Sequence, residues 1–242
     1  MEVIILQHIK IEDPGYIKDL MLSENCKLTT IELDEGEKIP ESLNKFDAMF
    51  CMGGPMDTWM EEKYPWLTEE KKRIKEFVVD QKKPFLGFCL GCQLLGEVIG
   101  GKVVKSKQSE IGMLDVNLTS ETKNDAIFSS FPKSIKALQW HSYEVQMLEN
   151  NKDVKILASS PITKFQIFKY KSHAYGIQFH IEVKNTTVKQ WGCVPEYKSV
   201  LENTFGKGAL ERFDREAKKN MEKMNFYSTN LYKSFKKKIV KI

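Results

Sequence analysis

The chain has 242 residues, 41% of them hydrophobic and 29% charged, which is the composition of a soluble globular protein. This balance excludes a disordered chain, a collagen-like fibre and a small disulfide-stapled scaffold, and the longest apolar runs are far shorter than the roughly 20 residues that span a bilayer. The net charge of +4 is weak evidence for a polyanionic partner, because residues 206–242 alone carry +7 and the preceding 205 residues therefore carry −3.

The first half of the chain alternates short apolar runs with helical periodicity, a pattern typical of strand–helix–strand units around a parallel sheet. We predict strands at residues 3–6, 27–33, 48–52 and 84–88. A helix is predicted at 66–81, where apolar residues recur at helical spacing, and another at 90–99, ended by a glycine pair.

The second half has a different pattern, in which β-type segments are separated by turn residues. These segments are 103–104, 113–118, 135–140, 155–158, 165–170 and 174–179. They predict an antiparallel region added to the parallel sheet. Because no linker composition and no internal repeat interrupts the chain, we expect a single domain over residues 1–242.

The C-terminal segment, residues 206–242, has apolar residues three or four positions apart, with one gap of seven between Met224 and Leu231. This spacing predicts a basic helix packed on the body of the protein. The alternative is a tether to an anionic membrane or a nucleic acid through Lys236–Lys238, which requires a cationic face that does not contact the body. We expect no nucleic-acid partner and no membrane partner.

The segment Gly87-Phe88-Cys89-Leu90-Gly91 lies between a predicted buried strand and a predicted helix. Its form, G-x-C-x-G, is that of a nucleophile elbow with a thiol in place of a hydroxyl. The sharp turn crowds the positions two before and two after the nucleophile, which favours glycine at both. The N-terminus of the following helix favours a thiolate and leaves the Leu90 amide free to bind a developing oxyanion.

Cys89 and Cys92 also form a C-x-x-C sequence at a strand-to-helix junction, where thioredoxin-type redox centres lie. This alternative leaves a downstream His/Glu pair unexplained.

The chain has five cysteines, an odd number, and no basic segment leads into an apolar run at its start. We therefore expect free thiols, no export signal and a cytoplasmic location.

A cysteine nucleophile for acyl transfer needs a base and a group that orients the base. His180 follows the predicted strand 174–179, and Glu182 comes two residues later. Two positions along an extended chain return side chains to the same side, so the carboxylate can hold the imidazole tautomer that accepts the thiol proton. His8 and His173 adjoin predicted loops and are expected to be solvated or structural.

Other motifs are weaker. Gly53-Gly54 directly follows a predicted strand, and backbone amides at a glycine pair can approach a substrate oxygen and act as a second oxyanion donor. Residues 96–103 nearly match a phosphate-binding loop, but Val103 replaces the hydroxyl that binds Mg²⁺. No Cys/His spacing is convincing as a zinc site, so we expect no metal and no cofactor.

An ordered set of segments carries a family resemblance over nearly the whole chain: Leu6–His8, Pro14-Gly15, Gly53–Met56, Tyr64–Leu67, Leu86–Leu95, Glu110–Gly112, Gln139–Ser142, Gly176–His180 and Glu182. In these the chain resembles the class I (triad-type) glutamine amidotransferases, in the stand-alone branch similar to the glutaminase domain of GMP synthase. The resemblance implies an α/β fold with three flavodoxin-like layers, a mostly parallel central sheet and added antiparallel strands.

The resemblance also implies a reaction. Cys89 would be the nucleophile, His180 the base and Glu182 the group that orients it. The thiolate would attack the γ-carboxamide of glutamine or of a related γ-glutamyl amide, release ammonia or an amine, and leave a γ-glutamyl thioester for hydrolysis. The implied oxyanion amides are those of Gly54 and Leu90, and the implied substrate-binding residues are Gly53, Gln93, His141, Ser142 and Tyr143.

The chain departs from the family pattern at two positions. The family usually has Pro between the His and the Glu, where this chain has Ile181, and the loss of a fixed φ is expected to leave the His180/Glu182 geometry less rigid. Cys92 stands where a small residue is common, and it narrows the pocket wall. Neither change removes a residue of the triad.

Several functions fit these residues. An amidotransferase would pass ammonia to a separate synthase subunit, whereas a free-standing hydrolase would cleave a γ-glutamyl amine or peptide outright. No ATP-pyrophosphatase segment follows the amidotransferase region, so we expect that the chain does not make GMP by itself. A degenerate, regulatory subunit is the non-enzymatic alternative. The related cysteine proteases and deglycases rank low, because they place a His directly after the elbow Cys, where this chain has Leu90.

Overall fold

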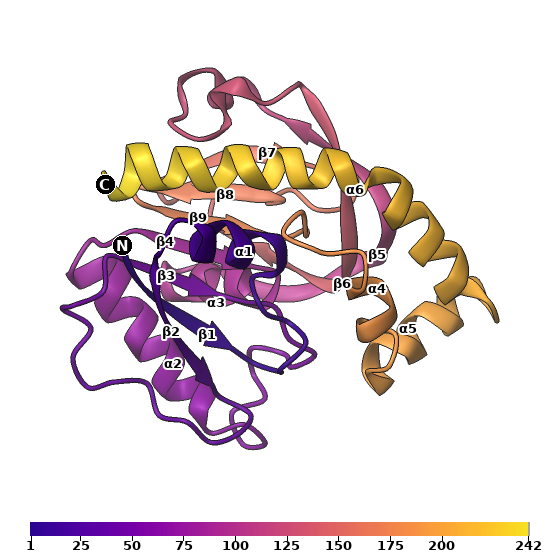
Figure 1. The fold of residues 1–242 in the computed structure, drawn as a ribbon, viewed down its shortest axis with the longest axis horizontal. Coiled ribbons are helices and arrows are strands. Elements are labelled where there is room, and N and C mark those ends of the chain that lie inside the picture. Colours follow the sequence, from indigo (N-terminus) through magenta and orange to yellow (C-terminus); the bar gives the residue numbers. More distant parts are fainter. Residues whose placement is uncertain (242) are drawn as a thin grey trace.

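The computed structural model describes residues 1–241. Their strands form one nine-stranded sheet of order β2-β1-β3-β4-β9-β8-β7-β5-β6 (Figure 1). The parallel strands are β2 (Lys27–Glu32), β1 (Glu2–Gln7), β3 (Ala48–Cys51), β4 (Phe85–Phe88) and β9 (Ala174–Ile177). The antiparallel strands that follow are β8 (Ile167–Tyr170), β7 (Val154–Ser159), β5 (Lys102–Leu118) and β6 (Ser134–Gln146).

Helices cover both faces of the sheet, because successive side chains of a strand point to opposite faces. Val3 and Ile5 of β1 join one buried apolar cluster, which contains residues of α1 (Gly15–Ser23) and α6 (Ala209–Ser234). Ile4 and Leu6 join the other, with residues of α2 (Trp66–Lys75) and α3 (Leu90–Val98). The three-layer α/β fold and the added antiparallel strands expected from the sequence are thereby confirmed.

The remaining helical segments are α4 (Thr187–Trp191), α5 (Pro195–Phe205), 3₁₀ turns at Ser120–Asn124 and Phe128–Ser130, and π-helical turns at Glu76–Asp80 and Phe235–Val240. Figure 1 shows α4 and α5 at one end of the molecule, beside the start of α6. No helix among residues 1–241 is both long enough and apolar enough to span a membrane.

Several predicted elements differ in extent from the observed ones. The segments 103–104 and 113–118 belong to one strand, β5, because the polar stretch between Lys105 and Glu110 is also extended and contains a register shift against β6. The strand predicted at 174–179 ends at Ile177. Helices α1, α4 and α5 were not predicted; α4 is only five residues long, and none of the three has the long apolar periodicity that identifies a helix.

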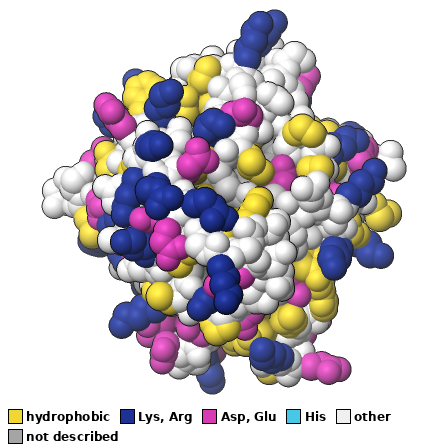
Figure 2. Space-filling view, turned by 90° about the vertical axis from the view of Figure 1, so that its right-hand side faces the viewer, with side chains coloured by type: hydrophobic (Ala, Val, Ile, Leu, Met, Phe, Trp, Pro, Cys, Tyr) yellow, Lys and Arg dark blue, Asp and Glu magenta, His cyan; other side chains and the backbone are white. Residues whose placement is uncertain are grey.

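The long helix α6 packs its apolar stripe on the sheet through Phe213, Ala217, Met221, Met224 and Leu231. The gap of seven residues in that stripe holds Ser228, which is fully buried. The face of the molecule that carries α4, α5 and the start of α6 displays Lys and Arg side chains interspersed with Asp and Glu (Figure 2). Near the other end of the C-terminal segment, Lys236 pairs with Glu24 of the body at 2.6 Å.

Candidate active site

Cys89 lies in the turn between β4 and α3 with a strained backbone, at φ 47° and ψ −102°. A positive φ is rare for a residue with a side chain, and strain of this kind concentrates at functional sites. The flanking glycines are required by crowding. A Cβ on Gly87 would lie 2.4 Å from the carbonyl oxygen of Gly91, and a Cβ on Gly91 would lie 2.1 Å from that of Cys51.

His180 and Glu182 meet just beyond the end of β9, the strand next to β4. The backbone of His180 exchanges hydrogen bonds with Leu138 of β6, and its Nδ1 lies 2.6 Å from Oε1 of Glu182. Burial disfavours the charged imidazolium, but the Glu182 carboxylate and the neighbouring Cys89 outweigh that penalty and hold the pKa of His180 well above its ordinary value. Trp191 of α4 packs edge-on against the ring, with 4.6 Å between centroids.

Ile181 contributes a contact that a proline could not make. Its backbone N–H donates to Oε2 of Glu182 at 2.9 Å, so both oxygens of that carboxylate are held, one by His180 and one by Ile181. The Ile181 carbonyl accepts a hydrogen bond from Ser228 of α6 at 2.6 Å. The flexibility expected from the missing proline is therefore countered by hydrogen bonds on both sides of this residue.

The backbone amides of Gly54 and Leu90 lie beside Cys89 and have no acceptor among residues 1–241. Two other amides of this region are occupied: Cys89 N–H donates to the carbonyl of Ile177, and Gly91 N–H donates to that of Met52. A buried amide without a partner is costly, and amides left free beside a nucleophile are suited to stabilise an oxyanion.

A pocket of about 230 Å³ opens beside Cys89. Its lining includes Gly54, Leu90, Gln93, His141, Ser142 and Tyr143, together with the acidic residues Asp57 and Glu196. The polar side chains in the wall are held in place: Gln93 donates to the carbonyl of Tyr143 at 3.2 Å, and Ser142 shares a hydrogen bond with Ser109 at 2.8 Å. Gly53 lies outside this lining, behind Gly54.

Three residues near Cys89 received no role from the sequence. The side-chain amide of Gln178 lies 3.6 Å from the Cys89 sulfur. Gln178 is part of the Gln178–His180 segment, in which only His180 was given a role. Glu12 is buried beside Gly53, and burial raises the pKa of its carboxyl group. Tyr197 of α5 lines the pocket and donates a hydrogen bond to Glu12. No sequence signal connects these last two residues, which meet only through folding.

Cys92 lies behind the site and offers no accessible thiol. Its side chain is fully buried in the first turn of α3, and burial raises the pKa of the thiol well above its ordinary value. The structure therefore supports a packing role for Cys92 beside the site.

The remaining histidines are buried, and their ring nitrogens face fixed hydrogen-bond partners. His8 is fully buried against Glu70, and His173 is buried with its Nε2 2.9 Å from the carbonyl oxygen of Val78. His141 is buried in the pocket wall with its Nδ1 3.0 Å from the carbonyl oxygen of Tyr143. Of the two roles expected for His8 and His173, the solvated one is wrong.

Comparison with known proteins gives the family of this chain. The family model "Glutamine amidotransferase class-I" matches residues 16–191. The chain is 35% identical over 174 residues to a glutamine-hydrolysing GMP synthase subunit from Sulfurisphaera tokodaii, covering 70% of this chain and 83% of that protein. It is 25% identical over 227 residues to a putative glutamine amidotransferase-like protein from Salmonella typhimurium, covering 93% of each.

Among solved structures, the fold is similar to a glutamine amidotransferase from Thermotoga maritima, with a TM-score of 0.86 and 30% sequence identity over 100% of this chain and 99% of that one. It is also similar to a glutamine amidotransferase from Methylobacillus flagellatus, with a TM-score of 0.82 at 21% identity, over 98% and 94% of the two chains. At that identity the second likeness concerns the fold alone.

Proposed function

The chain belongs to the class I glutamine amidotransferases, and on that premise we propose that it hydrolyses the γ-carboxamide of glutamine or of a related γ-glutamyl amide through Cys89, His180 and Glu182. The observation that carries this proposal is the strained elbow, which holds Cys89 beside two unpaired amides and beside a histidine fixed by a carboxylate. In acyl transfer the thiol is the nucleophile, the histidine moves the protons, and the amides stabilise the oxyanion.

In the first half of the reaction, His180 takes the thiol proton and the Cys89 sulfur attacks the γ-carbonyl carbon. The carbonyl π electrons move to oxygen, where the N–H groups of Gly54 and Leu90 stabilise the negative charge. When the carbonyl re-forms, the C–N bond breaks, and the proton on His180 goes to the departing nitrogen. The products of this half are ammonia or an amine and a γ-glutamyl thioester.

In the second half, water attacks the thioester carbonyl while His180 accepts a proton from it. The C–S bond then breaks, glutamate leaves, and the proton returns to the Cys89 sulfur. Throughout, Glu182 keeps the Nδ1 proton of His180 in place and stabilises the imidazolium, so the other ring nitrogen is available to exchange protons.

The pocket chemistry supports a glutamyl substrate. Asp57 and Glu196 are the only charged side chains in its lining within the described residues, and both are acidic. They complement the α-ammonium group of a glutamyl substrate, while Gln93 and the segment His141–Tyr143 supply hydrogen-bonding groups for its carboxylate. Gly53 does not line the pocket, and its role is to supply the carbonyl half of the peptide group that carries the Gly54 N–H.

We further propose that the ammonia is passed to a separate synthase subunit. The support is the similarity to proteins named as glutamine-hydrolysing GMP synthase subunits. A free-standing hydrolase of γ-glutamyl amines would use the same residues but would need no partner. The two differ in glutamine turnover by the isolated chain, which is strong for the hydrolase and negligible for an amidotransferase without its synthase.

The test is a panel of γ-glutamyl compounds, from glutamine to bulkier γ-glutamyl amines, with release of glutamate as the readout. Cys89→Ala serves as the blank. Cys193→Ala is the matched control, because Cys193 is an exposed free thiol of the same chain, and this variant is expected to behave as wild type. Turnover that persists in Cys89→Ala, or no turnover of any compound with or without the synthase partner, contradicts the proposal.

A further inference from the structure

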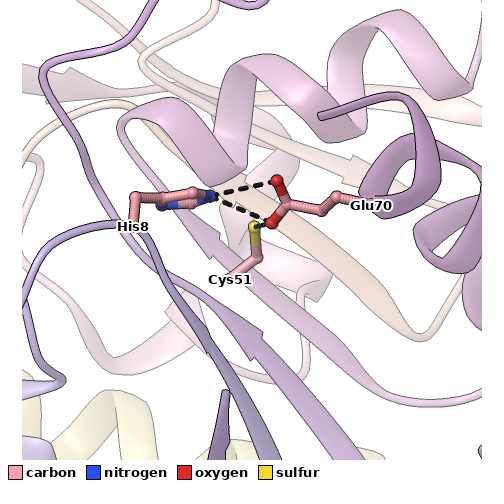
Figure 3. A group of neighbouring side chains, drawn as sticks. All are labelled: His8, Cys51 and Glu70. Carbon is pink, nitrogen blue, oxygen red and sulfur yellow. Dashed lines mark hydrogen bonds and ion pairs between the residues drawn. The ribbon is translucent and has the colours of Figure 1, made fainter. Parts of the chain in front are cut away.

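His8, Cys51 and Glu70 form a buried polar cluster (Figure 3), next to the Gly53-Gly54 segment. His8 follows β1, Cys51 ends β3 and Glu70 lies in α2, and all three side chains are fully buried. His8 Nε2 lies 2.9 Å from one oxygen of Glu70 and 3.2 Å from the other, and the Cys51 thiol donates to the same carboxylate at 3.3 Å. None of these residues lines the pocket described above.

Hydrogen-bond accounting assigns the protons of this cluster. His8 Nδ1 lies 2.9 Å from the carbonyl oxygen of Gly53, and its Nε2 faces the Glu70 carboxylate. A carbonyl oxygen and an ionised carboxylate can only accept, so with Glu70 ionised both ring nitrogens donate and the ring is an imidazolium. Burial opposes that charge, but Glu70 and the Gly53 carbonyl outweigh it and raise the pKa of His8. With both nitrogens protonated, His8 has no lone pair for a metal, so the cluster acts as a hydrogen-bond network.

The Gly53 carbonyl is one end of the peptide group whose other end is the Gly54 N–H. No peptide bond among the described residues is cis. In a trans peptide group the N–H points away from the carbonyl, so the Gly54 N–H points away from His8. Gly54 lines the pocket with Cys89, and its N–H has no acceptor among residues 1–241. Fixing the carbonyl therefore fixes the direction of the amide.

Such a peptide group needs a restraint, because glycine allows backbone rotations that other residues resist. Side chains cannot supply one at these two positions. A Cβ on Gly53 would lie 2.1 Å from the Glu12 carboxylate, and a Cβ on Gly54 would lie 2.8 Å from the Cβ of His8. The restraint must come from the hydrogen bond to the carbonyl, and Trp66 stacks on the His8 ring that makes it, at 5.6 Å between centroids.

We propose that the Glu70–His8 pair fixes the Gly53–Gly54 peptide group with the Gly54 N–H directed toward Cys89, which makes His8 a positioning residue for the oxyanion. Glu70 accepts a hydrogen bond from His8 Nε2 and stabilises the positive charge of the ring, and His8 Nδ1 donates to the Gly53 carbonyl. This inference rests on the proposed role of Gly54 as an oxyanion donor.

Two reactions of Cys89 test it, because only one of them forms an oxyanion. Acylation by p-nitrophenyl acetate passes through a tetrahedral oxyanion, whereas alkylation by iodoacetamide displaces iodide at a saturated carbon. The ratio of the two rates reports oxyanion stabilisation and cancels changes in the reactivity of the thiol. Cys89→Ala supplies the blank for both reagents.

The main variant is His8→Leu/Glu70→Leu, which removes both charges together and so leaves no unpaired buried ion. We expect the ratio to fall about 10- to 100-fold, since losing one oxyanion donor costs about 10²- to 10³-fold and a released peptide group still samples the productive orientation. His8→Asn places an amide donor near the former Nδ1 position and is expected to recover most of the ratio. His173→Leu, which also removes a buried histidine bonded to a carbonyl, is the matched control and is expected to keep the wild-type ratio.

An unchanged ratio in the double variant overturns the proposal, and so does an equal fall in His173→Leu. If the double variant fails to fold, His8→Phe/Glu70→Gln decides, because it keeps a ring against Trp66 and the shape of the Glu70 side chain while it removes the Nδ1 donor and both charges; it should lower the ratio, and a wild-type value overturns the proposal. Neither reagent is a γ-glutamyl compound. A protein that hydrolyses no γ-glutamyl amide but shows the expected change in ratio would refute the proposed function and leave this inference standing.

Discussion

Ser228 joins the C-terminal helix to the active-site segment, because its hydroxyl donates to the carbonyl of Ile181, between His180 and Glu182. The Ser228 side chain is fully buried, and no other donor reaches that carbonyl among residues 1–241. Ser228→Ala removes the donor with almost no change in volume. It therefore leaves a buried carbonyl without a partner.

A buried polar group left unsatisfied costs about 1–3 kcal/mol. For a chain of this size, each kcal/mol lowers the unfolding midpoint by about 2–4 °C. We therefore expect Ser228→Ala to lower the midpoint by about 2–12 °C. The two hydrogen bonds that hold Glu182 do not involve Ser228, so turnover should fall by less than about tenfold.

Calorimetry and steady-state kinetics measure the two effects. The matched control is Ser234→Ala, on the same helix, because no hydrogen bond of the Ser234 side chain is present within residues 1–241. This control should leave both quantities unchanged. The reasoning is refuted if Ser228→Ala leaves the midpoint unchanged or shifts it no more than the control does.

Three further substitutions test the site. Glu182→Gln cannot accept from both His180 and Ile181 through its two terminal atoms, and we expect kcat to fall by about 10³- to 10⁴-fold; a fall below tenfold would argue against a triad. Ile181→Pro removes the N–H that holds Oε2 of Glu182, so it should lower kcat, and an increase would show that the fixed φ matters more. Cys92→Ala should retain most of its glutamate release, whereas a redox centre would lose its activity.

The arrangement of the candidate site was predictable where it is local in the chain. The elbow around Cys89 is a five-residue pattern, and the two-residue step from His180 to Glu182 is visible in an extended segment. Tertiary partners were not predictable, because pattern carries no information about which segments meet. Glu12 and Tyr197 are separated by 185 positions and bond only after α5 has packed over the pocket.

The fold was predictable for similar reasons. Buried parallel strands are continuous apolar runs, so β1, β3 and β4 are evident from the sequence. Strand β5 was divided in two because its polar stretch after Val104 breaks the alternation on which the prediction depends. Ser228 had a signal that can be interpreted only with the structure: it is the polar residue inside an apolar stripe, at the point where α6 crosses Ile181.

The most direct test of the central claim is covalent labelling by the glutamine analogue 6-diazo-5-oxo-norleucine, followed by peptide mapping. The exposed Cys193 gives an internal reference for labelling that does not depend on the site. The account predicts an adduct on Cys89 that forms faster than any adduct on Cys193 and that excess glutamine suppresses. Labelling of Cys193 without labelling of Cys89, or labelling of Cys89 that glutamine does not suppress, would contradict it.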